Sequence, residues 1–300
     1  MMMNKPLVLG TAGLGGVWGA VDPAHSITTV LAALEYGVDG IDTAPAYGDA
    51  EAYVGAALRQ WKGTMPMLSS KVGRLKSYAA DEGHYDYTPE GMTRSVGESL
   101  QTLGVSCLDT LFIHDPQAIP VAEVERVMTT LAGFRDRGWV QRLGVGGNWP
   151  VWMKKYLDEG WFDVMMEYNR VNACCTEGLT DSLPYCMQHG LQYFVASPLN
   201  MGLLGRCIRQ FREMRPAWLE EDKLMTAARL EQLAGDAGLT LPAMAHRFLL
   251  SLPYSFTIVI GASDTTELEN TWSDFASGPL PEQLMQQVLS CISDKKQGDV

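Results

Sequence analysis

Four residues in the first part of the chain have side chains suited to moving a proton. Asp42 and Tyr47 lie five residues apart, and Lys71 and His114 each stand near the end of a short apolar run further along. A free tyrosine has a pKa near 10, and a nearby ammonium such as that of Lys71 lowers it. We expect Asp42 to hold Lys71 in place and protonated. Tyr47 could then donate a proton to a carbonyl oxygen or accept one from an alcohol, while His114 orients the substrate oxygen or shares the proton.

The elements that would position these side chains alternate along the chain. Short apolar runs predict strands, and segments with helical periodicity lie between them. Eight such units favour a closed parallel barrel, so we predict an α/β protein with one (β/α)8 TIM barrel domain over residues 1–300. The predicted strands are 7–12, 40–44, 67–72, 110–114, 142–146, 164–168, 192–196 and 257–260. The predicted helices are 26–36, 50–61, 89–103, 121–137, 150–158, 178–189, 219–237 and 265–275, with extra C-terminal helices at 241–250 and 281–292.

Barrel enzymes place their chemistry at the carboxyl ends of the strands. Asp42 and Tyr47 lie at and after the end of the second predicted strand, Lys71 near the end of the third, and His114 at the end of the fourth. Each residue alone has an ordinary structural interpretation, such as a helix cap or a surface charge. Because all four stand in order at predicted strand ends, we expect them to meet on one rim of the barrel.

The composition excludes some classes of partner. The 300 residues include 23 Lys and Arg against 35 Asp and Glu, a net charge of -12. We expect no nucleic-acid partner, because phosphate backbones require clustered basic residues. No stretch approaches the roughly 20 apolar residues of a membrane span, and glycines interrupt any signal-peptide core near the start, so we expect a cytoplasmic protein with no membrane contact. The 6 cysteines form no C-x-x-C pair, and we expect free thiols and no metal site.

The motifs resemble those of the aldo-keto reductase superfamily. The family's first motif is similar to DTA at 42–44 followed by EAYVG at 51–55, with one extra residue in the spacer. The resemblance runs from Leu7 to about Phe275 and implies a nicotinamide cofactor that carries hydride. It also implies a catalytic tetrad made of Asp42, Tyr47, Lys71 and His114.

The resemblance implies cofactor contacts after the fifth and sixth predicted strands. Asn148 corresponds to the residue that reaches the nicotinamide carboxamide, whereas Gly147 replaces the usual serine before it. Met165 replaces the usual carboxamide-binding glutamine. Glu167 or Asn169 could substitute for that glutamine.

Further cofactor contacts are implied after the seventh and eighth predicted strands. Ala196 replaces the aromatic residue that usually stacks on the nicotinamide. The sequences ASPLNMGLL at 196–204 and GVGGN at 144–148, with the long segment 74–87, are similar to the aldose 1-dehydrogenase branch of the L-galactose and D-threo-aldose type. The expected cofactor contacts are Asn148, Glu167, Ser197, Leu199, Gly202, Gly261 and Ser263.

The cofactor is expected to be NAD or NADP, with NAD favoured. NADP-preferring relatives hold the 2′-phosphate with basic residues near the last strand, but no Lys or Arg lies between Arg247 and Lys295, and Asp264 adds negative charge. The alternative depends on a cluster of arginines that could fold over the cofactor phosphates. These are Arg206, Arg209, Arg212 and Arg215.

The substrate is expected to be a sugar or a small carbonyl or alcohol compound. Trp18 and Trp149 follow predicted strands and would form aromatic walls, and Tyr85 and Tyr87 are weaker candidates. Three alternatives stay open. The chain could be an NADPH-dependent aldehyde or ketone reductase, a cofactor-binding regulatory barrel with little turnover, or a lyase that uses Lys71 as a Schiff base.

Overall fold

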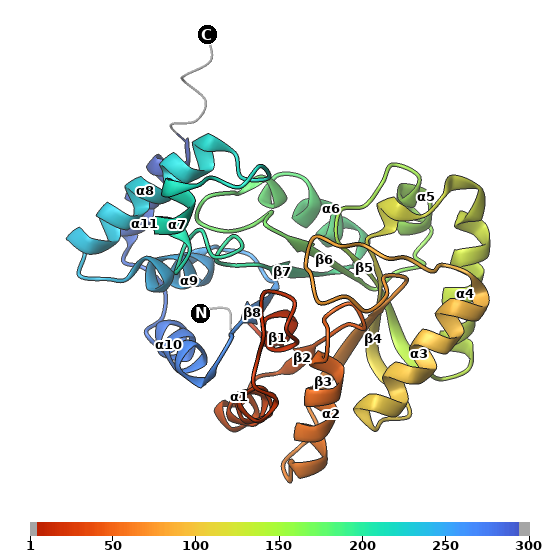
Figure 1. The fold of residues 1–300 in the computed structure, drawn as a ribbon. Coiled ribbons are helices and arrows are strands. Elements are labelled where there is room, and N and C mark those ends of the chain that lie inside the picture. The colour runs from red at the N-terminus through yellow and green to blue at the C-terminus, as the bar shows by residue number, and fades with distance from the viewer. Residues whose placement is uncertain (1–4, 294–300) are drawn as a thin grey trace.

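The chain folds into a closed barrel of parallel strands surrounded by helices, which confirms the predicted TIM-barrel architecture (Figure 1). A computed structural model describes residues 5–293. Neighbouring strands follow one another in sequence, and β1 closes the barrel by pairing with β8. The strands are β1 Leu7–Gly10, β2 Gly40–Asp42, β3 Met67–Val72, β4 Leu108–His114, β5 Val140–Gly146, β6 Val164–Tyr168, β7 Gln192–Ala196 and β8 Thr257–Gly261.

The helices cover the outside of the barrel. Their ends carry the expected local chemistry: α3 begins after Thr88, whose side chain accepts a hydrogen bond from the Gly91 amide, and it ends at Gly104 in the left-handed conformation. The helices are α1 Pro23–Tyr36, α2 Ala50–Gln60, α3 Pro89–Leu103, α4 Val124–Asp136, α5 Met153–Asp158, α6 Ser182–His189, α7 Ile208–Glu213, α8 Glu221–Asp236, α9 Leu241–Ser251, α10 Thr265–Ala276 and α11 Glu282–Ser293. Over residues 5–293, no helix combines the length and apolar character needed to cross a membrane.

A few element ends differ from the prediction. The first strand stops at Gly10, because residues Ala12–Leu14 turn into a 3₁₀ helix. The predicted helix 150–158 begins only at Met153, after a turn in which the Met153 amide bonds to the Pro150 carbonyl. The helices predicted at 121–137 and 178–189 each open with a separate 3₁₀ turn, and α7 was not predicted.

Side chains fill the inside of the barrel. Phe112 of β4 and Phe194 of β7 meet there with their ring centroids 6.0 Å apart, and both are buried. Val8, Val164, Met166 and Val259 complete this inner cluster. A packed interior leaves no channel, so a ligand can reach the strand residues only from the rim.

Helices α2 and α3 approach each other closely at Gly55. A Cβ atom placed on Gly55 would lie 2.1 Å from the backbone carbonyl oxygen of Thr102, at the end of α3. Only glycine allows this contact without moving backbone. Since α2 directly follows Tyr47, the contact also fixes the segment that carries this side chain.

We therefore predict that Gly55→Ala lowers the free energy of unfolding by about 1–3 kcal/mol, because the added methyl group meets backbone. Gly97→Ala is the matched control: Gly97 lies within α3, and a Cβ there would meet no atom within 4 Å. That substitution should raise the free energy of unfolding by about 0.5–1 kcal/mol. Urea unfolding measures both, and equal stabilities of the two variants would contradict the close helix contact.

Candidate active site

The structure brings the four predicted catalytic residues together at the carboxyl end of the barrel. Asp42 ends β2, Lys71 lies near the end of β3, His114 ends β4, and Tyr47 lies in the turn before α2. All four line one cavity of about 460 Å³. The convergence follows from the parallel barrel, since the carboxyl ends of its strands share one rim.

Lys71 and Asp42 form a buried ion pair. Lys71 Nζ lies 2.6 Å from Asp42 Oδ2, and each side chain is only 3% exposed. Lys71 Nζ also donates to the Thr43 carbonyl at 3.0 Å, and Ser69 Oγ donates to Asp42 Oδ1 at 2.7 Å. Burial alone would lower the pKa of Lys71, but the charge of Asp42 and the contact with Tyr47 raise it overall. The ammonium therefore stays charged inside the protein.

Tyr47 lies against this ammonium. Lys71 Nζ is 4.7 Å from the centroid of the Tyr47 ring. The sequence-based expectation of a lowered tyrosine pKa needs correction: burial raises the pKa of Tyr47, and Lys71 offsets only part of that rise. The side chain is thus a neutral phenol at physiological pH, with a cation beside it that would stabilise its phenolate.

His114 is a neutral imidazole in this setting. Its ring lies perpendicular to that of Tyr47, with the centroids 5.8 Å apart. Burial lowers the pKa of His114 well below its ordinary value, and the positive charges of Lys71 and Arg74 lower it further. Nδ1 is buried and has no hydrogen-bond partner among residues 5–293. His114 also lines the cavity, so its ring can exchange hydrogen bonds with a ligand there.

The segment 74–87 forms one wall of the cavity, together with the residue after His114. Tyr87 is buried under this wall, where its Oη donates to the His114 carbonyl at 2.5 Å and to the Asp115 carbonyl at 3.0 Å. Tyr85 stacks on Tyr87 and lines the cavity. Trp18 also lines it, with 55% of the residue exposed at the mouth.

Trp149, by contrast, is not brought into the cavity. It stacks on Tyr185 of α6 with the ring centroids 5.9 Å apart and packs against the outer core. The prediction of Trp149 as a substrate wall therefore needs correction. The chain turns after β5, and that turn directs this ring toward α6.

The expected cofactor residues divide into two groups. Ser197 and Gly261 line the cavity. The others lie outside it: Asn148 is exposed to solvent, Leu199 packs on the outer core, Ser263 bonds to Arg206, and Gly202 faces Cys207.

Glu167 points away from the cavity. Tyr193 Oη donates to its carboxylate at 2.7 Å, and Arg170 lies 4.0 Å from the same oxygen. Alternate residues of a strand face opposite sides, so Met166 points inward while Met165 and Glu167 point toward the helices. The suggestion that Glu167 contacts the cofactor is therefore incompatible with this orientation of its side chain.

The glycine that replaces the usual serine at 147 has a structural reason. Gly147 has φ = +106°, a conformation that side chains rarely adopt. A Cβ atom there would also lie 3.1 Å from Asp115 Oδ1. Glycine therefore leaves room for the Asp115 carboxylate beside the end of β5.

Sequence reasoning missed Tyr168, which lines the cavity at the end of β6. Tyr168 pairs in register with Ala196, the position where an aromatic ring was expected. The signal in the sequence was that Tyr168 and Ala196 are the last residues of two consecutive predicted strands, 164–168 and 192–196. Its ring lies where it could replace the missing aromatic surface.

The cavity offers features that fit a nicotinamide group. The ends of β5, β7 and β8 line it with small residues, which leaves space for a flat ring. Asn169 Oδ1 and Asn200 Nδ2 are buried beside cavity-lining residues and have no partner in the described part of the chain.

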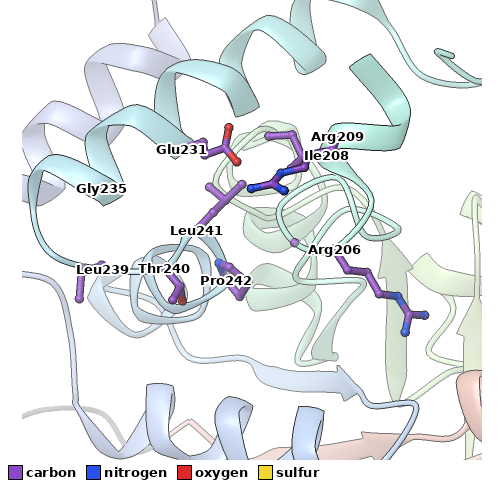
Figure 2. Close-up of a pocket in the computed structure, with 10 residues that line it drawn as sticks. Arg206, Ile208, Arg209, Glu231, Gly235, Leu239, Thr240, Leu241 and Pro242 are labelled. Carbon is purple, nitrogen blue, oxygen red and sulfur yellow. The ribbon is translucent and has the colours of Figure 1, made fainter. Parts of the chain in front are cut away.

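A second cavity of about 520 Å³ lies between the segment after β7 and the helices α8 and α9 (Figure 2). Arg209, Glu231 and Thr240 are among the residues that line it. Arg206 extends from its edge toward the end of β8, where it donates to Ser263 Oγ at 2.9 Å and to Glu267 at 2.8 Å. The four predicted catalytic residues line the first cavity instead.

Comparison with known proteins agrees with this architecture. Residues 6–293 match the model of the Aldo/keto reductase family. The chain is 29% identical over 282 residues to the NADH-specific methylglyoxal reductase of Escherichia coli, covering 85% of each chain. It is 24% identical over 298 residues to the D-threo-aldose 1-dehydrogenase of a Pseudomonas species, covering 92% of this chain and 90% of the relative.

Solved structures show the same fold. The glycerol dehydrogenase from Gluconobacter oxydans superposes with a TM-score of 0.78 at 24% identity, covering 98% of this chain and 93% of that one. The family match spans nearly the whole chain and includes every strand of the barrel. The chain therefore belongs to the aldo/keto reductase family and is an NAD(P)-dependent oxidoreductase.

Proposed function

We propose that this enzyme interconverts a carbonyl group and an alcohol of a sugar or small aldehyde, with Tyr47 as the proton-transfer residue. One observation carries the proposal: a buried ammonium, held 2.6 Å from Asp42, lies 4.7 Å from the Tyr47 ring inside the cavity. The names of two relatives, a methylglyoxal reductase and an aldose 1-dehydrogenase, support this substrate range.

The protonation states of Tyr47, Lys71 and His114 give each residue a different proposed role. When bound, the nicotinamide supplies or accepts the hydride. In reduction, the Tyr47 hydroxyl donates its proton to the substrate oxygen, and the Lys71 ammonium stabilises the phenolate that remains. His114 is neutral, so it can donate a hydrogen bond to the same oxygen without adding a charge. In oxidation each transfer runs in reverse.

The geometry disfavours a Schiff base at Lys71. A Schiff base requires a neutral amine as nucleophile. Asp42 and Tyr47 raise the pKa of Lys71, so the amine is protonated. The ion pair thus supports an electrostatic role for Lys71 rather than a covalent one.

Replacing Tyr47 by Phe tests its role. Loss of a general acid should lower kcat by about 10²–10⁴-fold while the affinity for the cofactor stays near normal. Tyr53→Phe is the matched control, because Tyr53 lies on α2 and its hydroxyl bonds to Asp49 on the surface. Steady-state kinetics and cofactor fluorescence measure both variants. A Tyr47→Phe enzyme with a normal turnover rate would exclude this residue as the acid.

The pKa shift of Tyr47 predicts opposite pH profiles for the two directions. Reduction requires the protonated phenol, so kcat/KM for reduction should be constant near neutral pH and fall only as the pH rises through the raised pKa. Oxidation requires the phenolate, so kcat/KM for oxidation should rise with pH over the same range. Between about pH 6 and pH 10, which lies below the raised pKa, kcat/KM for reduction should stay constant while kcat/KM for oxidation rises, and rates in both directions check this. Parallel profiles in the two directions would contradict the assignment.

We also infer a preference for NAD. Arg206 reaches the residues that follow β8, where it is paired with Glu267, whose other oxygen accepts from the Ser263 amide at 2.9 Å. A 2′-phosphate near this loop would meet the Glu267 carboxylate, whereas a 2′-hydroxyl could donate to it. The relative from Escherichia coli is named as NADH-specific, which agrees with this preference.

Fluorescence titrations with NADH and NADPH test the preference. We expect the Kd for NADH to be at least about ten-fold lower. Glu267→Gln should reduce this ratio, because Arg206 then keeps its full charge for a phosphate. Glu269→Gln, an exposed position on the same helix, should leave the ratio unchanged. Tighter binding of NADPH by the unmodified enzyme would overturn the inference.

A further inference from the structure

The cavity wall formed by segment 74–87 and Asp115 carries a group of three side chains that the proposed proton transfer does not use. Arg74 Nη1 and Tyr85 Oη both donate to Asp115 Oδ2, each at 3.2 Å. All three residues line the cavity that contains Tyr47. The second guanidinium nitrogen of Arg74 donates to the carbonyls of Ala80 and Glu82, which fastens the segment 74–87 to this wall.

Asp115 holds an unfavourable backbone conformation. Its φ and ψ are 51° and 56°, in the left-handed region, and the next residue is Pro116, which disfavours helical conformations in the residue before it. The Asp115 amide donates to the Gly146 carbonyl at 3.0 Å, and Tyr87 Oη bonds to the Asp115 carbonyl. Strain that surrounding contacts maintain in this way is concentrated at functional sites. Here it accompanies a carboxylate that faces the cavity.

One oxygen of this carboxylate is available to a ligand. Both protein donors bind Oδ2, and none of the residues that the structure describes donates a hydrogen bond to Oδ1. The absence of a side chain on Gly147 leaves Oδ1 uncovered, because a Cβ there would stand 3.1 Å away. A carboxylate oxygen only accepts hydrogen bonds, so the ligand group that binds Asp115 Oδ1 must be a hydrogen-bond donor.

We propose that Asp115 Oδ1 accepts a hydrogen bond from a hydroxyl group of the substrate, so that the enzyme selects neutral polyhydroxylated carbonyl compounds over plain aldehydes. This inference rests on the proposed function. Arg74 neutralises Asp115, and Asp81 adds a negative charge to the same wall, so an anionic substrate is disfavoured. The exposed ring of Trp18 at the mouth offers an apolar surface for the C–H face of such a molecule.

The selection depends on the hydrogen bond to Asp115 Oδ1 that a substrate without the hydroxyl group cannot form. A site built to bind a substrate hydroxyl rejects the analogue that lacks it, because a buried polar group is left without a partner. Hydrogen bonds to charged groups correspond to roughly 10-fold to 100-fold in an equilibrium or rate constant. The Asp115 side chain is 10% exposed, so water replaces the missing hydroxyl only in part.

The test compares two substrates of equal carbon number, glyceraldehyde and propanal, in the direction of reduction. The enzyme should show at least about ten-fold higher kcat/KM for glyceraldehyde than for propanal, and Asp115→Asn should remove most of this ratio. The ratio is the readout because the loss of the Asp115 charge near Tyr47 acts on both substrates alike. Asparagine tolerates the left-handed conformation. Its amide oxygen must face the donors Arg74 and Tyr85, so its NH2 group replaces the acceptor in the cavity. Asp136→Asn, the same change at an exposed position on α4, is the control and should leave both substrates unaffected.

A second measurement does not depend on turnover. Calorimetry follows the binding of xylitol to the enzyme saturated with reduced cofactor, where no reaction is possible, and Asp115→Asn should weaken it about ten-fold. Equal losses for glyceraldehyde and propanal, or xylitol binding that the substitution leaves unchanged, would overturn the proposal. Absence of turnover with both aldehydes would reject the proposed function instead, and the xylitol result would still decide the role of Asp115.

Discussion

The buried ion pair between Lys71 and Asp42 is the interaction on which the rest of the site depends. Removing both charges from water carries a penalty of several kcal/mol for each ion, which only close contact and further hydrogen bonds can offset. Ser69 Oγ and the Thr43 carbonyl supply those bonds. A pair of this kind contributes little net stability, so its presence is better explained by the charge that it delivers. Burial is the main cause of the shifted pKa values of His114 and Tyr47; the fixed ammonium adds to it at His114, which stays neutral, and opposes it at Tyr47, where it stabilises the phenolate.

The barrel supplies the pair with its geometry. Asp42 of β2 lies in register with Ser69 of β3, and Lys71 follows two residues later on the same face of that strand. Ser69 and Lys71 can therefore both bind the Asp42 carboxylate, because alternate side chains of β3 face the same side. Lys71 is in turn in register with Phe112, whose ring centroid lies 5.8 Å from Nζ and which belongs to the buried cluster inside the barrel. The filled barrel interior keeps the charged pair away from bulk water on that side.

The sequence predicted the parts of the structure that depend on order along the chain. Strand ends and helix caps are local, so β3, β6, β7 and α3 were predicted with the observed bounds. The direction in which a strand side chain points is not local. Residues 164–167 are buried on both faces of the strand, as is usual for parallel strands, so the sequence could not show that Met166 points inward and Glu167 outward. The same limit applied to Trp149, whose direction depends on a turn, and to Tyr47, whose pKa reflects a balance between burial and charge.

The residues proposed for substrate recognition and for proton transfer share one electrostatic environment. The negative charge of Asp115 raises the pKa values of Tyr47, Tyr85 and Tyr168, alongside the burial that dominates each shift. Arg74 opposes that effect at Tyr85 and Tyr168, and it helps to keep His114 neutral. Without Arg74, the charge of Asp115 would therefore raise the pKa values of Tyr85 and Tyr168 further. Arg74 is bonded at once to Asp115 and to the backbone of segment 74–87, so this wall of the cavity carries a carboxylate acceptor with a compensating charge held beside it.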